Sequence, residues 1–163
     1  MDTVGIWSNS DALAAKLTGR LGRAYRFVWG DHPACFAPRG DVLSPVELLV
    51  VAPDATGLAG LTVLRPRLAL LPGGSAAACR GVRAASAVSY GLGSQNTLTL
   101  SSMTGGSVSV ALQRELLTLS GKAVERQEWV LPMDSAASAE EFLCLAGALL
   151  LLDQSLGEAQ STD

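Results

Sequence analysis

The chain has 163 residues, a formal net charge of −3 and 48% hydrophobic residues, which predict a single globular domain with a sizeable core. The acidic balance argues against nucleic-acid binding and against an anionic membrane surface, because both need a basic excess or a local basic cluster. The three cysteines lie far apart, so they predict neither a disulfide framework nor a zinc site. Reduced cysteines and the lack of a basic, apolar leader after Met1 favour a cytoplasmic protein.

The first elements predicted along the chain are a strand, a helix and a second strand. The apolar run Thr3–Trp7 predicts the first strand, and Tyr25–Trp29 predicts the second. Between them an apolar stripe from Ala12 to Leu21 predicts a helix, and 8–11 supplies side-chain oxygens that can cap its first turn. This order predicts a βαβ unit with a right-handed crossover, which opens a Rossmann-like sheet.

Three further strands are predicted for the same, mainly parallel sheet. Val46–Val51 is almost continuously apolar, which is typical of a strand covered on both faces in the middle of a parallel sheet. The other two strands are Arg67–Leu71 and Ala84–Tyr90, while the proline-rich stretch 30–45 predicts a loop. The expected fold class is therefore α/β, with a Rossmann-like sheet flanked by helices.

The stretch 87–132 alternates like antiparallel strands and predicts a β-meander that extends this sheet. Asn96–Ser102 and Ser107–Leu112 alternate polar and apolar residues on either side of two glycines, which tolerate the positive φ of a hairpin turn. A second hairpin is predicted from Leu116–Leu119 and Lys122–Arg126, with a turn at Ser120 and Gly121. We expect the meander to end before Pro132.

A C-terminal helix is predicted over Ser135–Leu152, with Ser135 or Ser138 as its cap. Its later part, Phe142–Leu152, is apolar on nearly every side but far shorter than the roughly 20 residues that a membrane-crossing helix needs. We therefore expect this helix to be buried, either against the sheet or against a second protein chain. Residues 1–155 are expected to form one domain, and 156–163 a flexible tail.

Candidate ligand-binding residues follow the predicted strands, where open α/β sheets place their ligands. A strand-to-helix turn can bind a phosphate or carboxylate through free helix amides, although serine and asparagine at such a turn are also ordinary helix caps. No glycine fingerprint of a dinucleotide site or of a P-loop is present, so no ATP, NAD or other cofactor is expected. The candidates are Ser8, Asn9, Ser10, Asp54, Gly73, Gly74, Tyr90 and Gly91.

No catalytic or metal-binding residues are assigned. His32, the single histidine, lies three residues before Cys35 and could form a base and nucleophile pair, but neighbours in a loop need not converge. Glu115, Glu125 and Glu128 could serve as acid and base, and they are explained more simply as the solvated face of the meander.

The C-terminal half resembles the later part of the central domain of the Mur ligase family. In that family a strand ending in an aromatic residue and glycine leads into β-hairpins and then an alanine-rich helix. Tyr90 and Gly91 match the strand end, and Ser138–Leu150 stands where that helix stands. The ATP-binding loop and the magnesium-binding glutamate and histidine of the family have no counterparts here, so the resemblance implies the fold and a ligand-binding domain but no ligase activity.

These observations favour a non-catalytic domain that binds a partner protein or a second copy of itself, through the meander and the C-terminal helix. Edge strands and a helix that is apolar on nearly every side both need to be covered. The alternative is a small transferase or hydrolase, or a Mur-ligase-like domain that binds a small molecule. Its site would lie at the carboxyl ends of the strands, near Ser8, Asp54, Gly73 and Tyr90.

Overall fold

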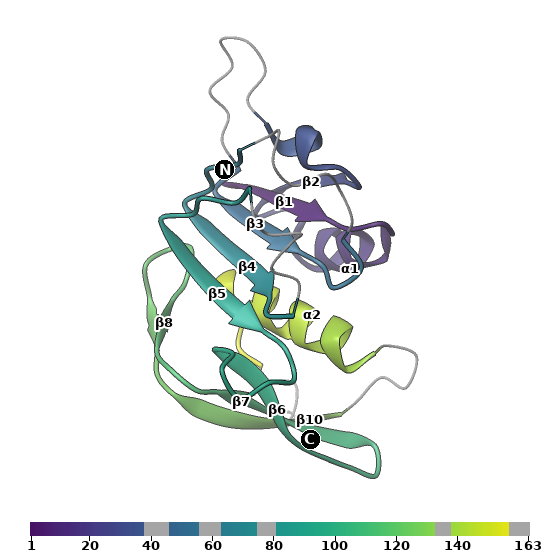
Figure 1. Ribbon diagram of the computed structural model, residues 1–163, viewed down its shortest axis with the longest axis vertical. Helices are drawn as coiled ribbons and strands as arrows, with labels where there is room; N and C mark the ends of the chain where they lie inside the picture. Colours follow the sequence, from purple (N-terminus) through teal and green to yellow (C-terminus); the bar gives the residue numbers. More distant parts are fainter. Residues whose placement is uncertain (38–45, 56–62, 75–80, 133–137, 157–163) are drawn as a thin grey trace. The chain divides into compact units, whose positions relative to one another are not determined.

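The fold is α/β, as the sequence predicts (Figure 1). The computed structural model describes residues 1–37, 46–55, 63–74, 81–132 and 138–156. Its main sheet is mixed and mostly parallel, with eight strands in the order β10-β7-β6-β5-β4-β3-β1-β2. The chain divides into two compact units, which we call the N-terminal unit (1–71 and 75–87) and the C-terminal unit (72–74 and 88–163).

The N-terminal unit begins with the predicted βαβ arrangement. Strand β1 (Thr3–Trp7) is followed by helix α1 (Ala12–Leu21) and by strand β2 (Arg26–Gly30), which pairs with β1 in parallel. Strand β3 (Leu48–Val51) pairs with the other side of β1, also in parallel, and all four of its residues are buried. The prediction that this apolar run forms an interior strand of the sheet is confirmed, since β4 (Leu68–Pro72) pairs with its far side.

A short 3-10 helix, η1 (Pro33–Phe36), interrupts the predicted proline-rich loop and brings Phe36 into the core of this unit. Gly5 in the middle of β1 makes that packing possible. A Cβ atom built on Gly5 would lie 2.9 Å from carbon atoms of both Phe36 and Val46. A larger residue would therefore push these two side chains away from the sheet. The rest of the loop, 38–45, lies outside the described residues.

Strand β5 (Ser86–Tyr90) pairs with β6 (Leu98–Thr104) in parallel, and β6 begins the antiparallel part of the sheet. The first predicted hairpin is confirmed: β6 pairs with β7 (Ser107–Leu112) around Gly105 and Gly106, whose φ angles are +36° and +87°. Strand β10 (Gln127–Pro132) then pairs with the other side of β7. These three strands, β6, β7 and β10, are called the meander below.

The second predicted hairpin forms, but its expected place in the meander is wrong. Strands β8 (Leu116–Leu117) and β9 (Ala123–Val124) make a separate two-stranded sheet, so that β10 rather than β8 lies beside β7. The turn residue Gly121 has a φ of +93°, as expected. The hairpin leaves the main sheet because Leu116 and Leu119 are buried and the Leu119 N–H donates to the Leu151 carbonyl at 2.8 Å, which ties it to the C-terminal helix.

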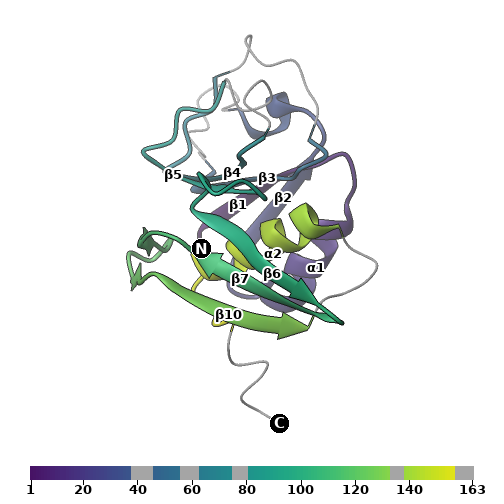
Figure 2. The ribbon, with the colours of Figure 1, turned by 60° about the horizontal axis from the view of Figure 1, so that its bottom comes forward.

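Helix α2 (Ala139–Leu151) confirms the predicted C-terminal helix. Its cap is Ser138, whose hydroxyl accepts from the Glu141 N–H at 3.1 Å, whereas Ser135 lies outside the described residues. In the C-terminal unit α2 packs on β6, and Figure 2 shows the helix against one face of the meander. Within the part of the chain that the structure covers, neither helix is long and apolar enough to cross a membrane.

Candidate functional site

The structure gathers most of the predicted ligand-binding residues into two clusters, one in each unit. Ser8, Asn9 and Asp54 meet in the N-terminal unit, at the carboxyl ends of β1 and β3. Gly73 and Gly91 meet in the C-terminal unit around the side chain of Asn96, and the backbone carbonyl of Tyr90 accepts from the Gly73 N–H. We call these the Asp54 cluster and the Asn96 cluster.

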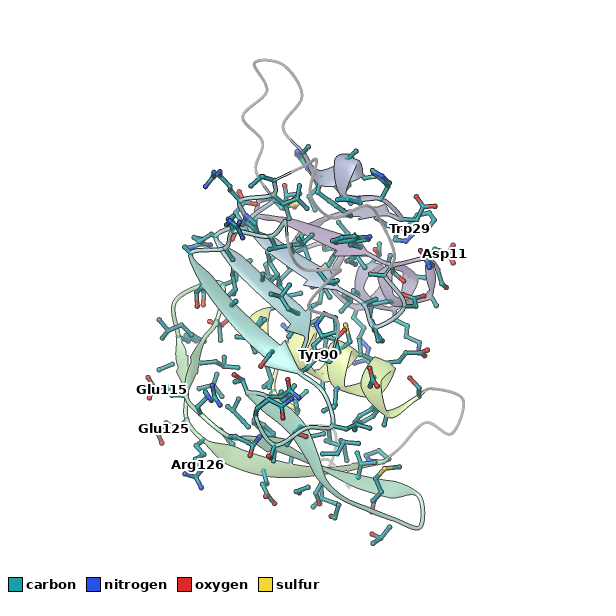
Figure 3. The ribbon with its side chains drawn as sticks, viewed as in Figure 1. Asp11, Trp29, Tyr90, Glu115, Glu125 and Arg126 are labelled. Atoms are coloured by element: carbon teal, nitrogen blue, oxygen red, sulfur yellow. The ribbon has the colours of Figure 1, made fainter. Side chains whose placement is uncertain are left out.

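The Asp54 cluster is a hydrogen-bond network between two loops. The Ser8 hydroxyl donates to Asp54 Oδ1 at 2.9 Å, and the Asn9 backbone N–H donates to the same oxygen at 3.4 Å. The Asn9 side-chain amide donates to the Asp54 carbonyl at 2.8 Å. The Trp29 indole N–H donates to the Ser8 carbonyl at 3.2 Å, and Figure 3 labels this tryptophan near the start of α1.

This network bears on both interpretations of the β1–α1 turn. The Ser8 hydroxyl also accepts from the Ser10 N–H at 3.2 Å, and the Ser10 hydroxyl accepts from the Ala12 N–H at 3.2 Å. The polar side chains are thus used to hold the turn and the helix start, while the Asp54 carboxylate brings a negative charge to the place where a phosphate would bind. The geometry therefore favours loop closure over anion binding at this cluster, while Asp11, the N-cap residue of α1, makes no side-chain cap hydrogen bond.

The Asn96 cluster is built on two close approaches to glycine. A Cβ atom on Gly73 would lie 1.8 Å from Asn96 Oδ1, and one on Gly91 would lie 2.8 Å from Asn96 Nδ2. Both glycines end strands that are neighbours in the sheet, and the Gly73 N–H donates to the Tyr90 carbonyl at 2.8 Å. Only a residue without a side chain fits beneath the Asn96 amide at these strand ends.

Asn96 itself is 2% exposed and is not among the site residues that the sequence predicts. Its Nδ2 donates to the Gly93 carbonyl at 3.0 Å, whereas its Oδ1 has no hydrogen-bond partner among the described residues. Tyr90 is 1% exposed, so its ring belongs to the core, and Gly74 has no atom within 4 Å of its would-be Cβ. The signal that could have indicated Asn96 is a pair of glycines at the ends of adjacent strands, which leaves room for one side chain above them.

His32 and Cys35 do not form a base and nucleophile pair in the structure. The His32 side chain accepts from the Ala34 N–H at 3.1 Å through Nδ1 and so caps the 3-10 helix that contains Cys35. The cysteine is an exposed free thiol. Among the residues with described positions, no group of three or more histidine, cysteine, aspartate or glutamate side chains is placed to hold a metal ion.

The three glutamates of the C-terminal unit that the sequence offers as acid and base lie in solvent. Glu115, Glu125 and Glu128 are all exposed, and Figure 3 shows the first two projecting from the surface near Arg126. Their position agrees with the simpler interpretation, in which they form a solvated face.

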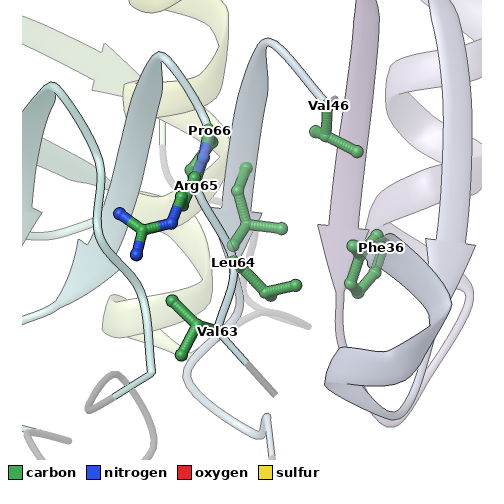
Figure 4. Close-up of a pocket in the computed structure, with 7 residues that line it drawn as sticks. Phe36, Val46, Val63, Leu64, Arg65 and Pro66 are labelled. Carbon is green, nitrogen blue, oxygen red and sulfur yellow. The ribbon is translucent and has the colours of Figure 1, made fainter. Parts of the chain in front are cut away.

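A pocket in the N-terminal unit is shown in Figure 4. It has a volume of about 190 Å³ and is lined by apolar side chains, among them Phe36, Val46 and Leu64, with Arg65 as the charged member. Such a lining offers no pair of groups for acid–base chemistry.

The chain finds no match among known protein families, curated proteins or solved structures.

Proposed function

We propose that this chain is a non-catalytic binding module that associates with a second copy of itself through the edge strand β10. The observation that carries the proposal is the place of β10 as the last strand of the sheet, with β7 as its neighbour on one side. An edge strand presents a row of backbone N–H and C=O groups that another strand can pair with. A second copy supplies an identical edge, so a closed two-fold pair satisfies both edges at once.

The exposed side chains of β10 favour one register. Val130 is 53% exposed, whereas its neighbour Leu131 is buried at 7%. In a two-fold pair each face of the sheet continues into the second copy. A residue of β10 must therefore lie opposite a residue of the second β10 that belongs to the same face. A register centred on Val130 meets this condition and buries the two valines against each other. It also places Glu128 opposite Pro132 of the second copy, so that the two carboxylates do not face each other.

Helix α2 is less suited to be the interface than the sequence suggests. Leu149 and Leu151 are only 8% and 0% exposed within the single chain. A helix whose apolar residues are already covered has little left to bury against a partner. We therefore place the association at β10 and treat α2 as part of the core.

Light scattering of the purified protein tests this proposal. Wild type is expected to be a dimer, and Val130→Lys is expected to be a folded monomer, because the register places the two lysines opposite each other. Val63→Lys is the matched control, since Val63 is a valine of similar exposure, 48%, in the N-terminal unit. It should remain a dimer. A wild type that is monomeric at all concentrations, or a Val130→Lys variant that stays dimeric, would rule out association through β10.

A further inference from the structure

Besides the apolar pocket, the N-terminal unit contains a groove of about 510 Å³, which we call the arginine groove. It lies where the chain enters β3 and β4, at the end of these parallel strands opposite the Asp54 cluster. The lining residues that the argument uses are Val46, Glu47, Arg65, Pro66, Arg67 and Arg83.

The strand register places two of the arginines next to each other. Leu64 pairs with Val82 in a parallel bridge, in which the Arg83 N–H donates to the Leu64 carbonyl at 2.8 Å. The next pair along this ladder is Arg65 and Arg83, on backbones about 5 Å apart. Leu64 and Val82 pack in the apolar core of the unit, so the side chains that follow them point to the opposite face.

The side chains of the groove agree with this register. Figure 4 shows Arg65 pointing away from Phe36 and Val63, which belong to the apolar side. Arg65 and Arg83 are both exposed, and Arg67, also exposed, adds a third guanidinium just before β4. The groove therefore gathers three guanidinium groups from two neighbouring segments of the chain.

The charges that line the arginine groove do not balance. Among the described residues its one acidic lining residue is Glu47, whose Oε2 accepts from the Thr3 N–H at 2.5 Å. Even with this carboxylate counted, the three arginines leave a formal excess of two positive charges. Like charges directly opposite each other on adjacent strands are destabilising, and Arg65 and Arg83 are such a pair. An anion bound between them would offset that cost.

The opposite end of the strands carries the other sign of charge. Asp31 and Asp54 follow β2 and β3, so they make the carboxyl ends of these strands acidic. Open α/β sheets usually place ligands at the carboxyl ends, but here the field of these carboxylates repels an anion. Within the N-terminal unit an anion is therefore attracted to the amino ends, where the arginine groove lies.

We propose that the arginine groove binds a small organic phosphate. A phosphate group carries nearly two negative charges at neutral pH, which matches the excess in the groove better than one carboxylate does. Guanidinium groups bind phosphate oxygens through paired N–H groups, and each has five, so a guanidinium that already has a partner can still donate.

The size of the groove indicates more than a bare ion. Sites for small organic molecules have volumes of about 300–1,000 Å³, and the arginine groove falls in this range. Val46 and Pro66 supply an apolar wall for the body of the ligand. The site belongs to the N-terminal unit, so it does not depend on association through β10.

A titration of the chain followed by ¹H–¹⁵N NMR tests the site, with phenyl phosphate, inorganic phosphate and benzoate as probes at constant ionic strength. Phenyl phosphate shares its ring with benzoate and its charged group with inorganic phosphate. It is expected to bind most tightly, with saturating shifts at the amides of Arg65, Arg67 and Arg83. Benzoate should bind more weakly because it has one charge, and inorganic phosphate because it has no apolar body.

Substitution of the arginines separates this site from a general attraction to positive charge. Arg65→Gln and Arg83→Gln should each weaken phenyl phosphate about tenfold, the loss expected for one charge-assisted pair. Arg20→Gln, which removes an exposed arginine of the same unit outside the groove lining, is the control and should leave the affinity unchanged. Circular dichroism should show Arg65→Gln folded, because this side chain is exposed.

Four results would each overturn the proposal. The first is a set of shifts that do not saturate or that chloride reproduces, and the second is an Arg65→Gln variant that binds like wild type. The third is an Arg20→Gln variant weakened as much as Arg65→Gln, which would show diffuse attraction to the basic residues. The fourth is inorganic phosphate that binds as tightly as phenyl phosphate, which would show a site for an adventitious ion only.

Discussion

Gly73→Ala is the substitution for which the structure gives the largest and most specific expectation. The new methyl group would lie 1.8 Å from Asn96 Oδ1, far inside van der Waals contact. Asn96 cannot easily yield, because it is 2% exposed and its Nδ2 donates to the Gly93 carbonyl at 3.0 Å. The backbone is not the obstacle, since Gly73 is not among the glycines with positive φ in the described chain.

The magnitude follows from the two ways in which the chain can respond. If Asn96 stays, the overlap is relieved by shifting the ends of β4 and β5, and overpacking of this kind costs about 1–3 kcal/mol. If Asn96 rotates away, its hydrogen bond to Gly93 is lost at about 1 kcal/mol, together with its burial. We therefore expect a loss of about 2 kcal/mol in the free energy of unfolding, which for a chain of this length lowers the melting temperature by about 4–8 °C.

Thermal unfolding followed by circular dichroism measures this loss, and the neighbouring glycine provides a matched control. Gly74 has nothing within 4 Å of its would-be Cβ, so Gly74→Ala should leave the melting temperature almost unchanged. In an Asn96→Ala background, Gly73→Ala should cost much less, because the atom with which it collides has been removed. Equal effects of the two glycine substitutions, or an undiminished cost in the Asn96→Ala background, would show that Asn96 does not pack over Gly73.

Two further substitutions test the hydrogen bonds that fix the remaining elements. Asp54→Ala should lower the free energy of unfolding by about 1–2 kcal/mol in urea denaturation, because the Ser8 hydroxyl loses its acceptor. Asp31→Ala, which removes another exposed aspartate, is the control and should leave the free energy of unfolding unchanged. Equal effects of the two substitutions would contradict the network. Ser138→Ala should cost about 1 kcal/mol and reduce the helical signal of α2, because the Glu141 N–H loses its cap. Ser138→Asp should retain the cap, so a variant as unstable as Ser138→Ala would refute this role.

The strands that the sequence predicts well are those whose pattern admits one physical interpretation. A continuous apolar run such as 48–51 is stable only with both faces covered, and the structure buries all four residues of β3. The alternation in β7 likewise fixes which residues face inward, and Val108, Val110 and Leu112 are buried. In both strands the residues that are apolar in the sequence are the ones that the fold buries.

The position of the second hairpin could not be predicted because strand pairing is a long-range choice. The pattern of 116–126 describes a hairpin correctly but does not say whether it continues the main sheet. That choice depends on Leu116 and Leu119, which are buried, and on the hydrogen bond from Leu119 to the Leu151 carbonyl, more than thirty residues further along the chain. Nothing local in the sequence marks that contact.

The candidate sites show the same division between local pattern and long-range contact. Ser8 and Asp54 each follow a predicted strand, and the parallel pairing of β1 and β3 brings the Ser8 hydroxyl to 2.9 Å from Asp54 Oδ1, as the rule for the carboxyl ends of strands implies. No local sequence pattern marks Asn96 or Thr99, because the surroundings of their side chains are determined by the fold. Each carries a buried oxygen without a partner among the described residues.

Neither oxygen indicates a ligand site by itself, because both atoms are buried as well as unpartnered among the described residues. The Asn96 amide is held on its nitrogen side by Gly93 and enclosed by Gly73 and Gly91, so there is no space at its oxygen for a ligand of any size. Thr99 lies among the residues that line a groove on the meander, but its Oγ1 is likewise buried. An unsatisfied polar atom indicates a binding site only where the neighbouring groups leave room for a partner and supply the rest of its contacts. In the described chain neither Asn96 Oδ1 nor Thr99 Oγ1 meets the first condition, because both atoms are buried.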